Sequence, residues 1–158
     1  MKEMSEEDTK ALKDIENYGC HILNVLEDSE YPNFSYSIGI EKTFNKPEMV
    51  IVGLKRELAH SLINDYCSRI KKGEIFEAGK YYSDFLEGFE VCFIDVAKKH
   101  YKEHFGWANW LYKNNDFKVL QLIFPTTDNL WPWTNEVNES YLWWQRILNE
   151  EGKLENAI

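Results

Sequence analysis

Apolar and polar positions recur along the chain in patterns that predict helices and strands. Ser5 can cap a helix whose first turn is acidic and which Gly19 can close. Over Arg56–Lys71, aliphatic and aromatic side chains recur every three or four positions, which predicts a helix with one buried face. The predicted helices and helical turns are Ser5–Asn17, Arg56–Lys71, Tyr81–Leu86, Lys98–Tyr112 and Asn138–Asn149.

Other segments have the composition of strands. Phe34–Ile40 alternates strictly, with large apolar side chains on one face and Ser35, Ser37 and Gly39 on the other. Met49–Val52 is a continuous apolar run, which is typical of an interior strand. The predicted strands are His21–Leu26, Phe34–Ile40, Met49–Val52, Phe89–Val96 and Phe117–Phe124.

The order of these elements predicts an α+β fold in a single domain. Short turns join the early strands, which we therefore expect to be antiparallel, whereas helices separate the later ones. The result is a mixed, largely antiparallel sheet flanked by about four helices. We expect an acidic N-terminal helix over residues 1–17, the α+β domain over 18–149 and a C-terminal tail over 150–158.

Charge is distributed unevenly along the chain. The 158 residues include 18 Lys or Arg and 27 Asp or Glu, which gives a formal net charge of −9. A nucleic-acid partner is unsupported, because affinity for phosphates rests on basic side chains. Residues 1–30 carry −6 and residues 128–158 carry −4, which leaves +1 for residues 31–127. Electrostatic recruitment of a basic partner would therefore act through the terminal segments.

Cysteine usage and hydropathy indicate a cytoplasmic protein. Cys20, Cys67 and Cys92 are an odd number without close pairing in the sequence, which favours reduced thiols. Met1–Lys10 is too charged for a signal peptide, and no apolar run reaches the roughly eighteen residues of a membrane span. We expect no membrane association, and the sequence leaves the oligomeric state open.

Two histidines fit a zinc-peptidase pattern. His100, Glu103 and His104 match the H-x-x-E-H sequence of inverted zinc peptidases. On a helix the imidazoles lie one turn apart, so they could share a metal ion while the carboxylate activates its water. Three neighbouring lysines would repel a divalent cation, and a polar surface helix explains the pattern better. We therefore predict no metal site and no catalytic residue.

Small and aromatic side chains define the candidate binding residues. The bare strand face at Ser37 and Gly39 admits either a flat ligand or a covering helix. His60 could contact an anion or transfer a proton, or it could be a half-buried helical histidine. Six tryptophans gather in the C-terminal third, where they could line a pocket, anchor a protein partner or fill a core. The candidates are Tyr36, Ser37, Gly39, His60, Trp131, Trp133 and Trp144.

Four blocks of sequence carry a resemblance to a known family. They are Phe34–Ile40, Pro47–Leu54, Gly73–Gly79 and Val119–Pro125 through Trp131-Pro132-Trp133. In order and spacing they resemble the bacterial domain-of-unknown-function family 4262, from Tyr18 to about Trp133. The resemblance implies a compact bacterial domain and brings no reaction. Thr126-Thr127-Asp128 departs from the family, which usually has an acidic residue directly after the proline.

Two functions remain as expectations. The first is a non-catalytic binding domain of a bacterial accessory, stress or conflict system. It would recognise a protein partner or a small ligand through an aromatic-rich surface and need no cofactor. The alternative is a flavin- or nucleotide-binding protein with Ser37, Gly39 and His60 near the ligand, because Ser35–Gly39 and Pro47–Leu54 resemble flavin-reductase split barrels. Neither G-x-G-x-x-G nor G-x-x-x-x-G-K-[ST] occurs in the chain.

Overall fold

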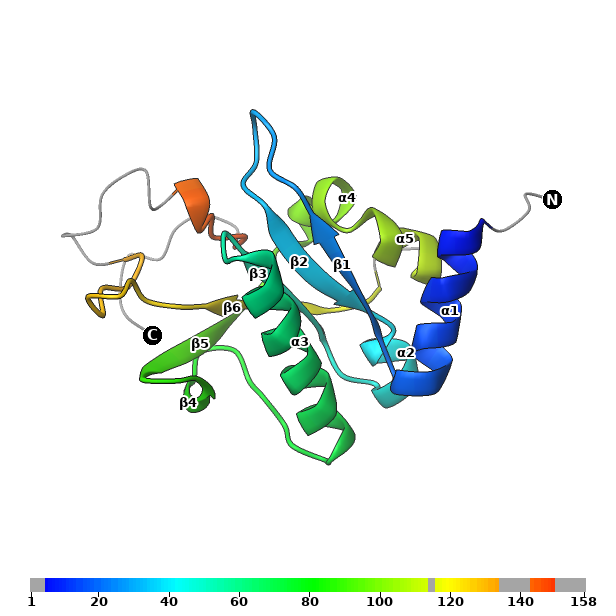
Figure 1. Ribbon diagram of the computed structural model, residues 1–158, viewed down its shortest axis with the longest axis horizontal. Coiled ribbons are helices and arrows are strands. Elements are labelled where there is room, and N and C mark those ends of the chain that lie inside the picture. The colour runs from blue at the N-terminus through cyan, green and yellow to red at the C-terminus, as the bar shows by residue number, and fades with distance from the viewer. Residues whose placement is uncertain (1–4, 114–115, 134–142, 150–158) are drawn as a thin grey trace.

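Six strands form one sheet in the computed structural model, which describes residues 5–113, 116–133 and 143–149 (Figure 1). The order across the sheet is β1-β2-β3-β6-β5-β4. The strands are β1 (His21–Val25), β2 (Phe34–Ile38), β3 (Glu48–Val52), β4 (Tyr81–Leu86), β5 (Phe89–Asp95) and β6 (Val119–Ile123). The helices are α1 (Glu6–Tyr18), α2 (Ile40–Phe44), α3 (Arg56–Lys71), α4 (Tyr101–His104) and α5 (Gly106–Tyr112), with a 3-10 turn η1 (Lys98–His100) before α4.

The sheet is mixed and largely antiparallel, as predicted. β1 and β2 pair so that His21 lies opposite Ile38 and Val25 opposite Phe34. The pairs β2–β3, β5–β6 and β4–β5 are also antiparallel, whereas β3 and β6 are parallel. β6 inserts between β3 and β5, which places the parallel pair in the middle of the sheet. Together with the helices, this arrangement confirms the α+β fold.

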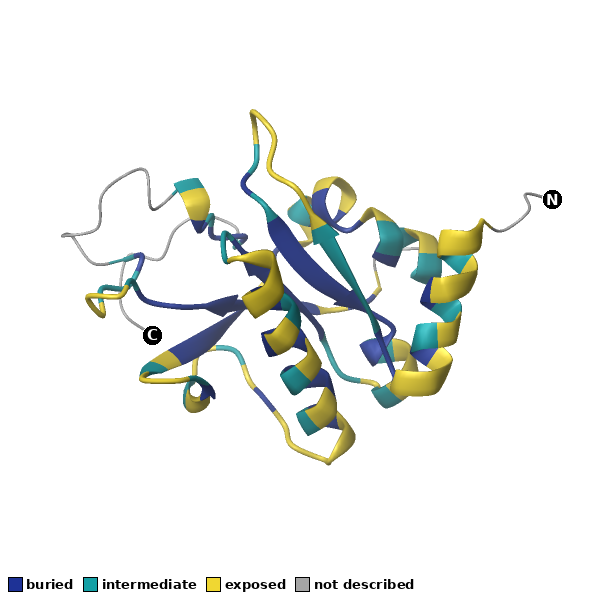
Figure 2. Cartoon of the chain, in the orientation of Figure 1, coloured by how far each residue is buried: buried dark blue, intermediate teal, exposed yellow. Residues whose placement is uncertain are grey.

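Helices cover both faces of the sheet. α3 lies across one face, where Ile63 packs in a cluster with Ile51 of β3. On the other face, Ile15 of α1 and Phe105, between α4 and α5, pack in a cluster with Tyr36 of β2. Figure 2 shows the result: β2, β3 and β6 are dark blue, and the outward sides of the helices are yellow. No helix within the described ranges is long and apolar enough to cross a membrane.

The two longest helices of the described chain lie where the sequence predicts them. Ser5 accepts the backbone N–H of Asp8 at 3.1 Å, and the Asp8 carboxylate accepts that of Ser5 at 3.2 Å, which is a capping box. Gly19 ends α1 with φ 95°, a left-handed conformation that suits glycine. α3 covers the predicted Arg56–Lys71, and every predicted strand is present within a few residues of its expected bounds.

Tyr81–Leu86 is a strand, so the predicted turn of helix is wrong. Tyr81 lies opposite Cys92 and Leu86 opposite Phe89 in the β4–β5 hairpin. Gly88 turns the chain between these strands with φ 83°. Pairing with β5 supplies the backbone hydrogen bonds that a local helical turn would otherwise provide.

The continuous helix predicted over Lys98–Tyr112 is also wrong, because Phe105 interrupts it. Its backbone angles, φ −118° and ψ 50°, separate α4 from α5. The ring is fully buried, and its centroid lies 5.2 Å from that of Tyr36 and 5.5 Å from that of Tyr101. Packing of this ring outweighs continuation of the helix, and the glycine that follows lowers the local helix propensity.

The strand predicted over Phe34–Ile40 ends two residues early, at Ile38. Gly39 has φ 100°, and the chain turns there into α2, a helix that the sequence pattern does not indicate. The Glu48 side chain accepts the backbone N–H of Gly39 at 3.0 Å. Because this contact comes from β3, the pattern of apolar and polar residues around Gly39 does not indicate it.

The helix predicted over Asn138–Asn149 falls only partly on described residues. Residues 138–142 lie outside them, and from Gln145 to Asn149 the backbone is not helical, so this part of the prediction is wrong. Two glutamine side chains hold the backbone here and replace helical hydrogen bonds. Gln145 bonds the Phe124 N–H and carbonyl at 2.9 and 2.8 Å, and Gln121 bonds the Arg146 carbonyl and the Leu148 N–H at 2.7 and 2.8 Å.

Candidate functional site

An apolar groove opens where β3 and β6 end. These strands are parallel, so their carboxyl ends lie at the same edge of the sheet. In α/β sheets this edge is where ligands bind. The groove has a volume of about 470 Å³. Its lining consists of Leu54, Leu58, Leu86, Glu87, Phe89, Phe124, Pro125, Thr126 and Thr127.

Four segments that are distant in sequence form the walls. Leu54 follows β3, Leu58 lies in the first turn of α3, Glu87 lies between β4 and β5, and Thr126 follows β6. The Asn33 side-chain amide donates to the Leu54 carbonyl at 2.8 Å, which fixes the first wall. The Thr126 N–H donates to a backbone carbonyl within its own loop at 2.8 Å, which fixes the last. The groove is therefore preformed.

The chemistry of the lining suits binding. Leu58 is 39% exposed, whereas Leu62, one turn later on α3, is 4% exposed. Of the nine lining residues, Glu87 alone has an ionisable side chain, and Thr126 and Thr127 contribute hydroxyls. Such a lining can hold an apolar body and orient one polar group.

A chain of polar side chains lies on the other flank of α3. The Ser35 hydroxyl donates to Asn24 Oδ1 at 2.7 Å, and Asn24 Nδ2 lies 3.4 Å from Nδ1 of His60. His60 is two positions after Leu58, about 200° around the helix, so it points away from the groove. The Ser35 hydroxyl donates to the side-chain amide of Asn24 and not to the imidazole of His60. His60 is therefore not placed to activate Ser35 as a nucleophile.

Ser37 and Gly39 meet at a buried carboxylate. Glu48 is 1% exposed and accepts the Ser37 hydroxyl at 2.8 Å and the Gly39 N–H at 3.0 Å. It also accepts the Tyr112 hydroxyl and the two backbone N–H groups that follow Gly39. Burial raises the pKa of Glu48 to about 7. The bare strand face is thus covered by α3 and occupied by this carboxylate.

The candidate tryptophans lie away from these residues. Trp131 and Trp133 stack with centroids 5.1 Å apart and an interplanar angle of 7°, and Tyr81 meets Trp131 edge-on at 5.2 Å. The pair is half-buried on the sheet face opposite α3. Trp144 is 42% exposed, and its carbonyl oxygen would lie 2.0 Å from a Cβ at Gly53.

The histidines of the H-x-x-E-H sequence are engaged in structural contacts. His100 Nε2 lies 2.9 Å from the carbonyl oxygen of Asn149, and His104 Nδ1 lies 3.1 Å from that of His100. Glu103 accepts the Tyr31 hydroxyl at 2.6 Å. Burial lowers the pKa of His104. Among the described residues, no group of three His, Cys, Asp or Glu side chains could hold a metal ion.

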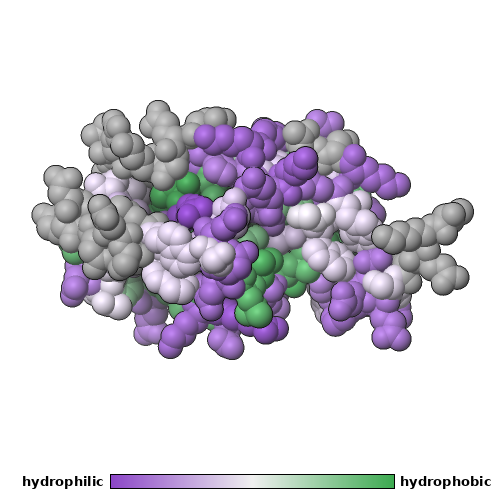
Figure 3. All heavy atoms as spheres, turned by 90° about the horizontal axis from the view of Figure 1, so that it is seen from above, coloured by the Kyte–Doolittle hydropathy of each residue, from purple (hydrophilic) through white to green (hydrophobic). Residues whose placement is uncertain are grey.

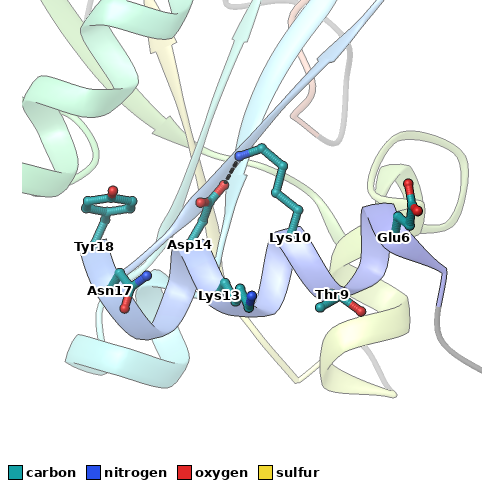
Figure 4. Close-up of a pocket in the computed structure, with 7 residues that line it drawn as sticks. All are labelled: Glu6, Thr9, Lys10, Lys13, Asp14, Asn17 and Tyr18. Carbon is teal, nitrogen blue, oxygen red and sulfur yellow. Dashed lines mark hydrogen bonds and ion pairs between the residues drawn. The ribbon is translucent and has the colours of Figure 1, made fainter.

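A second hollow, on the outer face of α1, is open and charged. Figure 4 shows its lining side chains, which all project from this one helix. Lys10 and Asp14 form an ion pair at 2.9 Å, and Asp14 also contacts His21 at 2.7 Å. Because no second element closes over these side chains, the hollow is a weaker candidate than the groove at β3 and β6.

The structure thus separates most residues that the sequence singled out. Tyr36 is buried, and its hydroxyl accepts the Trp107 N–H at 3.1 Å. Only Ser37 with Gly39, and Trp131 with Trp133, are brought together. Sequence reasoning missed the groove: Leu58 reads as one more apolar position of a helix. No pattern in the sequence singles out the groove, because its lining comes from segments that are distant in the chain.

A family comparison agrees with the resemblance noted in the sequence. The model of the family described as domain of unknown function (DUF4262) matches residues 14–138. The chain belongs to this family. No curated protein and no solved structure matches the chain.

Proposed function

We propose that this domain binds a small, largely apolar molecule in the groove at the carboxyl ends of β3 and β6. Leu58 carries the proposal, because it is 39% exposed inside a hollow whose lining is mostly apolar. The volume of about 470 Å³ falls within the range of roughly 300–1,000 Å³ that small-molecule sites occupy. A ligand there would remove apolar surface from water.

The size of the groove suits a small molecule. Seen from above in Figure 3, green hydrophobic surface emerges in small separate areas among purple hydrophilic side chains. The groove is a concave apolar site of limited size, which suits a compact ligand.

Polar groups of the lining indicate the chemistry of the ligand. The exposed carboxylate of Glu87 accepts hydrogen bonds, and the hydroxyls of Thr126 and Thr127 both donate and accept. A ligand with an apolar body and one hydrogen-bond-donating group fits this lining best. A cationic donor would bind most tightly, because a charge-assisted hydrogen bond to a carboxylate is stronger than a hydrogen bond between neutral groups.

A neutral dye whose fluorescence depends on polarity tests the proposal. Nile red titrated into the full chain is expected to bind saturably and to fluoresce more strongly. Leu58→Gln should weaken this binding at least tenfold. Leu26→Gln is the matched control, because Leu26 is 77% exposed and lies outside the groove lining. Absence of saturable binding, or equal weakening by both variants, would contradict the proposal.

The wider expectations stay predictions. A role in a bacterial accessory, stress or conflict system, with no catalysis, is compatible with a ligand-binding groove. Recognition of a protein partner through Trp131, Trp133 and Trp144, and of a flavin or nucleotide near Ser37, Gly39 and His60, are alternatives that the groove does not require. Ser37 and Gly39, which the flavin alternative needs, are engaged by Glu48.

A further inference from the structure

β1 forms one edge of the sheet, and β2 is the strand beside it. The Gly53 N–H donates to the Asn33 carbonyl at 2.8 Å, directly before β2 begins and on the side of β3. Backbone groups of successive strand residues point to opposite sides, so every second residue of β2, beginning with its first, faces β1. The β1 residues paired with them are His21, Leu23 and Val25. The backbone N–H and carbonyl groups of Ile22 and Asn24 therefore point away from the sheet.

This edge lacks the features that usually protect an edge strand. Among the described residues, no hydrogen bond outside the β1–β2 pairing engages the backbone of Ile22 or Asn24. Natural edge strands are shielded by charged side chains, proline or bulges. β1 contains no Lys, Arg, Asp, Glu or Pro, and its five residues pair without interruption. The opposite edge, β4, carries Asp84 and a register shift between Tyr82 and Leu86. β1 is thus the edge open to another strand.

Exposed apolar side chains flank this edge at both ends. Tyr18, which ends α1 shortly before the strand, is 68% exposed. Val25, the last residue of β1, is 38% exposed, and Leu26 after it is 77% exposed. A strand added along the edge would remove part of this surface from water, in addition to forming main-chain hydrogen bonds.

Acidic side chains at the end of β1 indicate the charge of the partner. The loop between β1 and β2 projects from the body of the fold and is yellow in Figure 2. It carries Glu27, Asp28 and Glu30 but no Lys or Arg, and none of these carboxylates forms an ion pair within the described chain. Lys or Arg on a partner would therefore be attracted. A second copy would bring the same acidic loop and the charge of −6 on residues 1–30, which disfavours pairing of two copies.

We propose that the outer edge of β1 binds an extended segment of another protein that carries Lys or Arg, which joins the sheet as an additional strand. Ile22 and Asn24 supply the main-chain hydrogen bonds, and Glu27 and Glu30 attract the basic side chains. Asp28 is less available, because its carboxylate already accepts two backbone N–H groups of its own loop at 2.8 Å. This surface is separate from the groove at β3 and β6, whose lining includes no residue of β1.

A peptide titration of the full chain, followed by amide NMR spectra, tests the proposal. The probe is an acetylated, amidated peptide of sequence KKTVTVT, whose alternating Thr and Val favour an extended strand. Saturable shifts are expected at the amides of Ile22 and Asn24, and hydrogen exchange of both amides should slow. The same peptide with methylated Thr and Val nitrogens lacks the donors of a strand and should not bind. EETVTVT should bind at least tenfold more weakly than KKTVTVT, and added salt should weaken binding of KKTVTVT.

Variants of the chain separate the two contributions. Asn24→Pro removes an outward N–H and no backbone hydrogen bond to β2, so it should weaken binding at least tenfold. Asn24→Ala is its control, because it loses the same side chain and keeps the N–H. Glu27→Lys combined with Glu30→Lys should also weaken binding at least tenfold. The matched control is Glu87→Lys with Glu90→Lys, exposed positions of the same spacing in the β4–β5 hairpin, which should bind as the wild type does.

The lysine variants change exposed side chains alone, so they decide the matter if Asn24→Pro fails to fold. Absence of saturable shifts at millimolar KKTVTVT would overturn the proposal, as would equal binding of the methylated peptide or of EETVTVT. Equal weakening by the two lysine pairs would also contradict it. Concentration-dependent shifts of the Ile22 and Asn24 amides in the chain alone would overturn it too, because a second copy would then occupy the edge.

Discussion

The two ends of β3, which is five residues long, have opposite characters. At its start, Glu48 is 1% exposed and its carboxylate accepts hydrogen bonds from five donors. Just beyond its other end, Leu54 faces a groove in which Leu58 is 39% exposed. One end is polar and closed to solvent, and the other is apolar and open.

This difference separates what stabilises the fold from what is available for binding. A buried carboxylate costs free energy unless hydrogen bonds satisfy it, and no buried side-chain nitrogen or oxygen in the described chain lacks a partner. An apolar side chain left partly in water contributes little to folding. Substitutions at the two ends of β3 should therefore act on different properties of the protein.

The largest effect is expected at the buried end. Glu48→Ala would leave Ser37, Gly39 and Tyr112 without the acceptor that they share, so the free energy of unfolding should fall by about 3–5 kcal/mol. Urea denaturation measures the loss. Glu90→Ala, an exposed carboxylate on β5, is the control and should change stability by less than about 0.5 kcal/mol. Similar losses of unfolding free energy in both variants would show that the hydrogen bonds of Glu48 do not stabilise the turn into α2.

The same carboxylate predicts a pH dependence. Burial raises the pKa of Glu48 from 4.5 to about 7, so the folded state keeps a proton that the unfolded chain releases at lower pH. The free energy of unfolding should therefore fall as pH rises between these two values, by at most about 3 kcal/mol, and this contribution should be constant outside that window. Urea denaturation across this range measures the slope, which Glu48→Gln should remove. An identical slope in the variant would assign the titration to other groups.

Gly53 lies at the open end of β3, directly after the strand and before Leu54. Its φ is 83°, and an added Cβ would lie 2.0 Å from the Trp144 carbonyl oxygen. Gly53→Ala should destabilise the protein by about 2–3 kcal/mol, from backbone strain together with displacement of the Trp144 segment. Gly88 is a matched control, since it also has φ 83° but meets nothing within 4 Å. Gly88→Ala should lower the free energy of unfolding by only about 1 kcal/mol, measured by thermal or urea denaturation. Equal losses in the two variants would mean that the contact with the Trp144 carbonyl does not contribute to the effect of Gly53→Ala.

Local signals in the sequence predict the elements that depend on local interactions. Ser5 and Gly19 mark the ends of α1, and the spacing of apolar side chains gives the bounds of α3. Elements that depend on distant contacts are missed. α2 requires a carboxylate from β3, the break at Phe105 requires an aromatic partner on β2, and β4 requires the neighbouring strand. Long-range packing decides each of these, and periodicity does not report it.

The candidate site shows the same limit. The small-residue face at Ser37 and Gly39 correctly indicates a close approach, but the approaching group is the side chain of Glu48. Helical spacing places Leu58 with the buried face of α3, although this side chain is 39% exposed, because spacing does not show which parts of a helix the rest of the fold covers.

The smallest effect on stability is expected at the open end. Leu58→Gln keeps the helix propensity of the side chain while replacing its apolar end with an amide, so the free energy of unfolding should change by less than about 0.5 kcal/mol. Leu62→Ala, one turn further along α3 where the side chain is 4% exposed, should cost about 2–5 kcal/mol in the same urea experiment. If Leu58→Gln instead destabilises the protein as strongly as Leu62→Ala, the groove wall belongs to the core, and weaker dye binding by that variant would reflect loss of structure. A small change in stability with a large loss of dye binding would assign Leu58 to ligand recognition, because the side chain would then matter to the protein chiefly when the groove is filled.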